Sequence, residues 1–477
     1  NTVSLAAGGT TRLTADTGVS VVGTLAVTGA ITSTDDLTIP DKIIHSGDTN
    51  TAIRFPAADT VSVETGSSEA FRVDSSQRLL VGSSSSRTIA NHAARIQLQG
   101  TDYQTSTLSI TNNANTGNGA FIFLASQRSG SIGGSTVLQN NDNIGTLRFF
   151  AGDGTDINSY AAEIQASIDG TPGANDTPGR LVFRTASDGA ASPTTRLTID
   201  STGKATFTVD ASINSVNIGK GANSVAGNTA LGESALDASV SGGDNTAIGQ
   251  AALTELTSGS HNTGVGHDVL RNTTTGSSNT ALGSNALDNN TTASNNTAVG
   301  KDALEVNTTG ASNTAVGSEA LADNTTGSFN IAIGRQALKD NTEASNNVGI
   351  GRAALGLNTT GTQNVAVGAL ALDANTTANI NTAVGYNALG ANTTGTENVA
   401  IGAYALDANT TADHNTAVGE NSMSANTTGS DNTGIGKSAL LVNTTGSNLT
   451  AVGRSALAAN TTGTRNTAVG ANALDSN

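Results

Sequence analysis

A 17-residue unit recurs from Asn228 to the end of the chain, and this repeat restricts the possible folds more than any other feature of the sequence. Numbered from Asn228, position 5 of the unit is Gly in all fifteen copies. Position 1 is Asn except at Leu449, position 4 is Val, Ile or Leu, and position 9 is Leu except at Met423. The consensus is N-T-A-V-G-x-x-A-L-x-x-N-T-T-G-x-x. Such constant spacing is the signature of a solenoid or another stacked array.

The residue types in the unit favour stacked β-coils. Each position would lie about 4.8 Å above its equivalent in the previous coil, so that Val, Ile and Leu form apolar columns and Asn side chains form amide ladders. Gly at position 5 would supply a corner that other residues disfavour. The alternative is a helical array, since Ala and Leu at positions 8 and 9 fit a short helix. Gly and Asn-Thr-Thr interrupt every unit, however, and leave too little helical sequence.

Composition excludes several classes of protein once the repeat is taken into account. The 56 Gly and the aromatic content of only 3% would suggest disorder in a chain without periodicity. All five prolines precede the repeats, as expected if every backbone N–H of the stack is needed for pairing. The absence of Cys excludes disulfides, the net charge of −16 argues against nucleic acid, and no apolar run is long enough to span a membrane.

The repeat unit also indicates that the chain does not act alone. Each unit offers few apolar side chains, most of them small, so that one chain buries little surface for each residue that it orders. Several chains around a common axis would bury the Val and Leu columns from more sides. We therefore expect a homotrimer, although composition alone does not fix the number at three.

The half before the repeats is predicted to be β-structure punctuated by Gly, Asn and Asp. Residues 18–40 alternate between apolar and polar and predict short strands, and Ala70–Gly82 and Leu197–Val209 each predict two strands joined by a turn. Six more strand candidates are Arg95–Gln99, Thr107–Thr111, Ala120–Ala125, Gly145–Ala151, Ala161–Ile168 and Arg180–Thr185, of which Ala161–Ile168 has a short helix as its alternative.

This pattern favours a β-sandwich or an intertwined β-prism before the solenoid. Aromatic residues gather in this region and predict the most conventional core of the chain, namely Phe121, Phe123, Phe149, Phe150 and Phe183. We predict four domains: a short-strand shaft segment at 1–40, a β connector module at 41–86, a β-rich fibre domain at 87–210 and the β-solenoid at 211–477, regular from 228. Because the chain starts at Asn1 without Met, we expect it to be a processed or excerpted piece.

Two groups of motifs resemble known families. Asn296–Gly300 (NTAVG) and Asn330–Gly334 (NIAIG) resemble the head repeats of trimeric autotransporter adhesins, which form left-handed parallel β-rolls in trimers. The adhesin unit is usually shorter than 17 residues, so the shape of the coil can differ here. Longer units with Asn-Thr-Thr-Gly, as at Asn307–Gly310, are similar to those of phage and phage-like fibre proteins.

The sequence before the repeats resembles tail-fibre proteins of phages, including cyanophages, in five segments that occur in the same order. They are DKIIHSGDTNTAIRF (41–55), FIFLASQR (121–128), GTLRFFAGDGTD (145–156), PGRLVF (178–183) and RLTIDSTG (196–203). The resemblance implies an elongated homotrimeric β-fibre of the virion that attaches to a glycan or protein on the host surface and contacts other tail or baseplate proteins. In that family a self-cleaving intramolecular chaperone often follows the repeats.

Two other functions remain as alternatives. One is a bacterial trimeric adhesin or extracellular fibre on the cell surface that uses the same roll. The other is a glycan-depolymerising tailspike, in which a pair of carboxylates would hydrolyse the sugar chain. The sequence shows no pair that must converge, and aromatic residues that would hold sugars are few. We predict a protein that is not an enzyme and that uses no cofactor.

Acidic residues on Gly turns are the candidates for metal binding. Asp153 and Asp156 in Asp-Gly-Thr-Asp could hold calcium, but the later ligands of an EF-hand loop are missing, which favours a plain β-turn. Asp169, Asp176 and Asp188 also lie beside turn residues, where Asp commonly bonds its own backbone. We therefore predict neither a metal site nor catalytic residues.

The remaining polar and aromatic candidates are scattered. We expect the five histidines to be solvated surface residues, namely His45, His92, His261, His267 and His414. Asn-Thr-Thr sequons such as that of Asn392 recur because the repeat recurs. The variable positions 6, 7, 10, 11, 16 and 17 should form the outer face, which also carries Phe329, Tyr386 and Tyr404. The two tyrosines, interpreted as isolated, do not identify a receptor site.

Overall fold

The computed structural model describes residues 24–32, 37–45, 47–112, 119–132 and 135–476. The chain divides into two compact units, Asn1–Thr194 and Thr195–Asn477. Within the described residues the regular structure is β-strand, apart from one 3₁₀ turn at Ala222–Ser224. The all-β prediction is confirmed, and the alternative of a helix at Ala161–Ile168 is wrong because this segment lies in strand β8.

The first unit begins with a six-stranded sheet in which β1 to β5 follow one another as an antiparallel meander and β6 pairs in parallel with β5. Alternation of apolar and polar residues and short turns at Gly and Asp produce this meander. The strands are β1 (Lys42–His45), β2 (Asp48–Ala57), β3 (Thr60–Thr65), β4 (Ser68–Val73), β5 (Leu79–Val81) and β6 (Ile96–Leu98).

A second antiparallel meander in this unit consists of β7 (Asn143–Phe150), β8 (Tyr160–Ile168) and β9 (Gly179–Thr185). These strands confirm the predictions made for the segments that start at Gly145, Ala161 and Arg180. The strands predicted at Thr107–Thr111 and Ala120–Ala125 are wrong, since neither segment pairs with another. The short strands expected in residues 18–40 are also absent from 24–32 and 37–40, while 18–23 and 33–36 lie outside the described residues.

The expected aromatic core of this unit is not found in the single chain. Phe121 and Phe123 stack on each other but are 64% and 85% exposed, and Phe149 is also exposed. The few fully or nearly buried apolar residues here are small or aliphatic, among them Leu80 and Ile168. The prediction fails because one layer of sheet covers only one side of its aromatic residues. An intertwined prism would need sheets from other chains and stays a prediction.

The second unit starts with a hairpin of β10 (Thr194–Ile199) and β11 (Ala205–Phe207), as predicted for Leu197–Val209. A second hairpin, β12 (Ala211–Ile213) and β13 (Val216–Gly219), then pairs antiparallel with β14 (Thr229–Gly232). The β12–β13 hairpin therefore covers the first edge of the solenoid sheet, which would otherwise present unpaired N–H and C=O groups.

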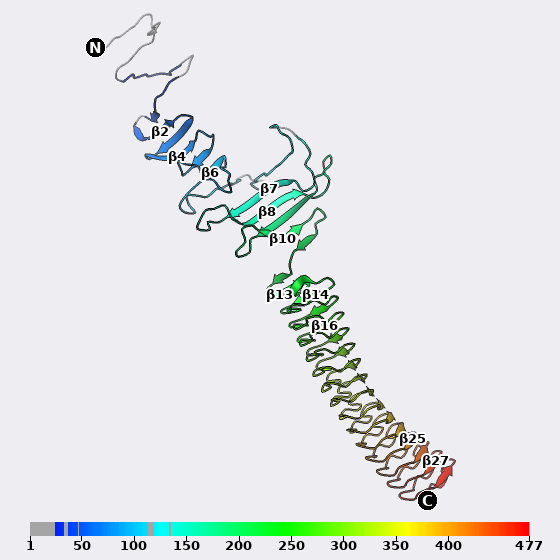
Figure 1. The fold of residues 1–477 in the computed structure, drawn as a ribbon. Coiled ribbons are helices and arrows are strands. Elements are labelled where there is room, and N and C mark those ends of the chain that lie inside the picture. The colour runs from blue at the N-terminus through cyan, green and yellow to red at the C-terminus, as the bar shows by residue number, and fades with distance from the viewer. Residues whose placement is uncertain (1–23, 33–36, 46, 113–118, 133–134, 477) are drawn as a thin grey trace, which may run out of the picture. The chain divides into compact units, whose positions relative to one another are not determined.

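From β14 onward every copy of the repeat forms one coil with one short parallel strand at positions 2 to 4 (Figure 1). The register is 17 residues throughout, as in Thr297↔Thr314 and Val299↔Val316. The predicted solenoid is confirmed. Its later strands are β15 (Thr246–Ile248), β16 (Thr263–Val265), β17 (Thr280–Leu282), β18 (Thr297–Val299), β19 (Thr314–Val316), β20 (Ile331–Ile333), β21 (Val348–Ile350), β22 (Val365–Val367), β23 (Thr382–Val384), β24 (Val399–Ile401), β25 (Thr416–Val418), β26 (Thr433–Ile435), β27 (Thr450–Val452) and β28 (Thr467–Val469).

The interior of the coils is built from small side chains and one large one. Ala or Gly at position 3, Ala at position 8 and Leu at position 9 form a continuous buried core along the stack. Leu304, Leu321 and their equivalents are fully buried, except Leu474 in the last coil. Because most coils direct only one bulky side chain inward, a narrow interior is filled without aromatic residues; a second one occurs at Val240, Leu256, Val269 and Leu449.

Two columns of buried Asn complete this interior and confirm the predicted amide ladders. At position 12, the Nδ2 of Asn324 donates to Oδ1 of Asn307 at 2.8 Å and to the carbonyl of Gly327 at 3.0 Å. At position 1, Oδ1 of Asn313 accepts from the backbone N–H of Asn330 at 2.9 Å. The Nδ2 of Asn313 donates to the carbonyl of Gly327 at 2.8 Å. Hydrogen bonds to adjacent coils therefore replace the hydrogen bonds to water that each amide loses on burial.

The corners of the coil require unusual backbone conformations. Gly at position 5 has φ near +135°, as in Gly317, and a Cβ there would lie 2.6 Å from the carbonyl group of Gly334. Leu at position 9 also has a positive φ in every coil, for example 52° at Leu321. A left-handed residue with a Cβ costs about 1–2 kcal/mol, whereas burying a Leu side chain contributes about 1.5–3 kcal/mol. Burial therefore outweighs the strain.

Replacing one ladder amide should destabilise the solenoid. In Asn324→Ala, Oδ1 of Asn307 loses its partner and Asn341 loses one of its two acceptors. We expect the free energy of unfolding in guanidinium to fall by about 1–3 kcal/mol. Thr326→Ala, at an exposed position of the same coil, is the control and should change it little. Equal effects of both substitutions would contradict the ladder's role.

A side chain at the position 5 corner should be tolerated poorly. Gly317→Ala adds a Cβ at positive φ and against the next coil, so that we expect a loss of at least about 1–3 kcal/mol from backbone strain. Gly356→Ala is the matched control, because Gly356 has no positive φ and its column contains Ala in other coils, at Ala322 and Ala458. Thermal melts of both variants give the comparison, and an unchanged melting temperature in Gly317→Ala would refute the argument.

Candidate functional site

The outward side of the solenoid strands is an uncharged, partly exposed face that extends along all fifteen coils. Because residues alternate in a strand, position 3 points inward and positions 2 and 4 point outward. Neither outward position carries a charge in any copy. We call the position 4 residues the outer apolar column: Leu231, Ile248, Val265, Leu282, Val299, Val316, Ile333, Ile350, Val367, Val384, Ile401, Val418, Ile435, Val452 and Val469.

This arrangement sharpens the prediction made for the Val and Leu columns. Leu at position 9 is fully buried within a single chain in every coil but the last, whereas the outer apolar column is half-buried or exposed. In the middle of the stack the face becomes more apolar, since position 2 changes from Thr to Ile331, Val348, Val365 and Val399. Of the two columns, the outer apolar column is therefore the one that remains exposed for contact with another molecule.

The two tyrosines of the solenoid are not isolated, contrary to the interpretation from sequence. Tyr386 is at position 6 of the tenth coil and Tyr404 is at position 7 of the eleventh, so their spacing of one coil plus one residue brings them together. The backbone N–H of Tyr404 donates to the carbonyl of Tyr386 at 2.9 Å. Their ring centroids are 5.3 Å apart with an interplanar angle of 78°, an edge-to-face contact. The rings are 46% and 41% exposed.

Small and uncharged residues surround this tyrosine pair. At position 6 the neighbouring coils carry Ala369 and Ala403, and charges return only with Arg352 on one side and Glu420 on the other. At position 7 the neighbours of Tyr404 are amides, Asn387 and Asn421, and the ninth coil carries Leu370. Within these two columns the patch is amphipathic and uncharged, and the acidic groups of these coils nearest along the chain are Asp373 and Asp407 at position 10.

The five histidines are exposed, as expected, but three have acidic neighbours. His414 lies between Glu397 and Asp431, 3.6 Å from a carboxylate oxygen of each, on the column of position 17. His267 lies 3.2 Å from Asp268, and His261 lies 3.8 Å from Asp244. Because these pairs are open to water, each is worth little to stability.

The Asp153–Asp156 loop has the geometry of a turn. Oδ1 of Asp153 accepts from the N–H groups of Thr155 and Asp156 at 2.9 and 3.0 Å, and these bonds lower the pKa of Asp153. Asp156 accepts from the backbone and side chain of Asn158 at 2.8 and 2.7 Å. Both carboxylates thus hold their own loop. Among the described residues, no group of three or more His, Asp or Glu is placed to hold a metal ion.

The other acidic candidates do not converge on one site. Asp169 contacts Arg180 at 3.4 Å, and Asp176 closes a small turn with Gly173. Asp188 is exposed. The sequon residue Asn392 belongs to the buried ladder, where its Nδ2 donates to Asn375 at 3.2 Å and to Gly395 at 3.0 Å. The sequon pattern is therefore a structural one.

One buried carboxylate was not found from the sequence. Glu163 on β8 is almost fully buried and pairs with Arg184 of β9 and with Arg148 of β7, the latter at 2.7 Å. The Arg148 guanidinium also lies over the ring of Tyr160, 4.9 Å from its centroid. This set of side chains joins three adjacent strands, and all of its charges are paired, which indicates a structural role.

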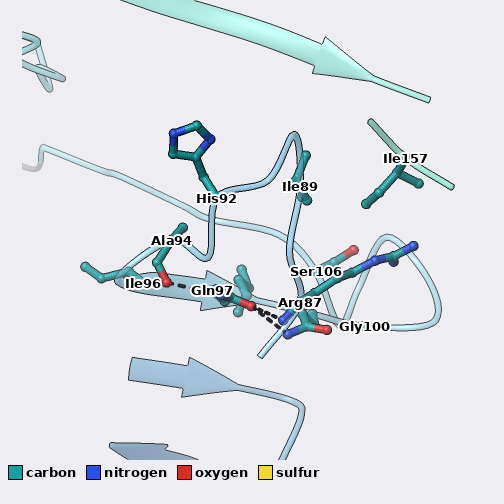
Figure 2. Close-up of a pocket in the computed structure, with 11 residues that line it drawn as sticks. Arg87, Ile89, His92, Ala94, Ile96, Gln97, Gly100, Ser106 and Ile157 are labelled. Carbon is teal, nitrogen blue, oxygen red and sulfur yellow. Dashed lines mark hydrogen bonds between the residues drawn. The ribbon is translucent and has the colours of Figure 1, made fainter. Parts of the chain in front are cut away.

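A pocket of about 430 Å³ lies in the first unit beside β6 (Figure 2). Its apolar wall includes Ile89, Ile96 and Ile157, and Arg87 and His92 lie at its edge. Gln97 is held in place, since its Oε1 accepts from the Arg87 N–H at 2.8 Å and its Nε2 donates to the Ala94 carbonyl at 3.1 Å. The pocket is open and mostly apolar, with Arg87 as its source of positive charge.

Three aspartates of position 10 lie in partly desolvated sites on the solenoid. Burial raises the pKa of Asp288, Asp373 and Asp407 above the usual range. Arg271 opposes this shift at Asp288, to which it donates at 2.9 Å. Asp407 has no such cation, and its Oδ1 is buried without a hydrogen-bond partner.

Removing the charge of Asp407 should stabilise the protein at neutral pH. A folded-state pKa that is raised above the unfolded value means that the folded chain binds the proton more tightly, so this contribution disfavours folding above that pKa and disappears as the pH falls below about 4. We expect Asp407→Asn to melt at a higher temperature than the wild type at pH 7, with the difference shrinking by pH 3.5.

The control is Asp237→Asn, in the same column but exposed, which should change the melting temperature little at either pH. A lower melting temperature of Asp407→Asn at pH 7 would contradict the assignment.

No protein-family model matches the chain, and no curated protein sequence matches it. Among the solved structures that match, two are similar to 35% of the chain, and both are of the carboxy-terminal domain of the bacteriophage T5 L-shaped tail fibre. One has 16% identity, covers 76% of that chain and has a TM-score of 0.26; the other, with its intramolecular chaperone domain, has 14% identity, covers 52% and has a TM-score of 0.20. In the described residues there is no helix long and apolar enough to cross a membrane.

Proposed function

We propose that the chain is a segment of a phage tail fibre or side fibre, that three copies associate along the solenoid, and that the fibre attaches to the host cell surface by multivalent binding. As a virion component it would also contact other tail or baseplate proteins. The observation that carries this proposal is the outer apolar column together with the uncharged position 2 beside it.

The length of this face favours association with copies of the same chain. Monomeric proteins rarely expose a contiguous apolar surface of more than a few hundred Å². Here the same two outward positions recur in every coil, so that a copy in register meets the same surface at each step of the stack. If several chains form a closed ring around an axis parallel to the stack, every copy buries this face in an equivalent contact. Three chains agree with the resemblance of the repeats.

A structural and adhesive role fits the chemistry of the described residues. Among the acidic candidates, Asp153 and Asp156 accept hydrogen bonds from their own turn and Asp169 pairs with Arg180. The repeat instead provides length, since each copy adds one coil to the stack. The five segments before the repeats that resemble tail-fibre proteins favour the phage fibre over a bacterial adhesin. Three identical sites on one fibre would strengthen weak individual contacts through their effective concentration.

The association is tested by charging the outer apolar column. We expect light scattering of the wild type to give a mass of three chains of 47.2 kDa each. In the triple variant Val367→Lys, Val384→Lys, Ile401→Lys, nine like charges would face one another across the trimer, and we expect monomers that remain folded. The control places the same charges at Thr377, Thr394 and Thr411, which are exposed at position 14 of the same coils. A wild-type monomer would refute the trimer.

Attachment is tested separately with fluorescently labelled wild-type protein and a panel of bacterial strains. We expect saturable binding to intact cells of a susceptible strain and weaker binding by the monomeric triple variant, because avidity is lost. Release of new reducing ends from cell-surface polysaccharide would instead support the tailspike alternative. Absence of binding to every strain would leave a trimeric spacer and refute the adhesive part of the proposal.

A further inference from the structure

We propose that the tyrosine pair, Tyr386 and Tyr404, is a binding site for neutral carbohydrate. This inference rests on the proposed function, because it names the class of ligand that such a host-facing fibre would contact. The site itself is argued from the side chains of the ninth to twelfth coils.

The pair presents aromatic surface that the fold does not use. The solenoid core is complete without the two rings, which touch each other edge to face and remain more than two-fifths exposed. Their positions are fixed by the coil-to-coil bond from the Tyr404 N–H to the Tyr386 carbonyl. Within the described part of the chain, neither phenol hydroxyl is used in a hydrogen bond. A rigid, exposed and amphipathic pair of this kind loses little conformational entropy when it binds a ligand.

The surroundings of the pair match a pyranose ring. A sugar has a flat C–H face, which packs on an aromatic ring, and a rim of hydroxyls, which need donors and acceptors. Ala369 and Ala403 carry only methyl side chains next to Tyr386 in its own column. Asn387 and Asn421 place side-chain amides in the column of Tyr404, and an amide both donates and accepts.

The charges favour a neutral sugar over an acidic one. Positions 6 and 7 carry no charge in the ninth, tenth and eleventh coils, and Arg352 belongs to the eighth. The chain as a whole has a net charge of −16, which disfavours the approach of an anionic polymer. A protein ligand is less well suited, because a stable protein interface needs a wider buried area than two rings supply. A trimer would present this site three times around one level of the fibre.

The test uses the full-length protein on an array of neutral oligosaccharides of glucose, galactose and mannose, beside sialylated and uronic-acid oligosaccharides. We expect binding to at least one neutral probe. Tyr386→Ala and Tyr404→Ala should each weaken it about tenfold or more, the loss typical of a removed anchor residue. The matched control is Phe329→Ala, which removes another exposed aromatic ring, at position 17 of the sixth coil, and should bind as the wild type does.

A second readout places the sugar on the rings. The chain has four Tyr and no Trp, so its intrinsic fluorescence comes from tyrosine. We expect the neutral probe that binds best to change this fluorescence in the wild type. The variant Tyr386→Phe, Tyr404→Phe keeps both rings and should retain binding within a few-fold while the fluorescence change is lost.

Three results would overturn the inference: no neutral probe bound, binding to acidic probes only, or unchanged affinity in both alanine variants. A fall in trimer mass in Tyr386→Ala without loss of sugar binding would also overturn it, by assigning the pair to a subunit contact. The proposed fibre function is tested by mass and by cell binding, so a trimer that attaches to cells but ignores all neutral probes refutes this site alone.

Discussion

Two columns of buried asparagine fix the register of the solenoid. At position 12 each amide bonds to its equivalents in the adjacent coils, as Asn307, Asn324 and Asn341 do, and at position 1 each side chain accepts from the backbone of the next coil. A shift by one residue would leave these buried amides unpaired, at a cost of about 1–3 kcal/mol for each group. The hydrogen bonds therefore specify one alignment of successive coils. The apolar side chains fill the remaining space and have little shape specificity of their own.

The same alignment determines which residues face outward. A strand of three residues has one inward position, and in this coil it is position 3, where Ala or Gly fits against Leu of position 9. Positions 2 and 4 must then face away from the interior, even where both are β-branched, as at Val365 and Val367. An interior that holds mostly small side chains therefore goes together with apolar residues on the outward side of the strands. A chain with a complete core of its own still exposes a face that can pack against a second chain.

Much of this could be predicted from the sequence, because the repeat displays it fifteen times. The spacing, the Gly corners and the Asn ladders followed from residue types alone, as did several strands of the first half, such as β8 and β9. The outward direction of position 4 did not, since Val and Leu both read as core residues until the strand is placed. The positive φ of Leu321 and its equivalents has no signal in a residue type that normally avoids it.

Contacts between different positions of successive coils also have no signal in the sequence. Tyr386 and Tyr404 belong to different columns, and only the pairing of position 6 with position 7 of the next coil brings their rings together. The strands expected at Thr107–Thr111 and Ala120–Ala125 failed for a related reason, because an alternating pattern shows that a segment is able to pair but not that a partner strand is present. Partners from other chains would change that outcome.

Disulfide trapping tests most directly whether the outer apolar column meets another copy of the chain. The protein has no Cys, so Val384→Cys introduces a single thiol in this column, and Ser318→Cys introduces one on the variable outer face. Under mild oxidation at low protein concentration, the account predicts rapid covalent dimers of Val384→Cys, since one thiol per chain joins two of three chains, and none of Ser318→Cys. Val384→Cys that stays monomeric and reacts with a thiol reagent as fast as Ser318→Cys would contradict the account.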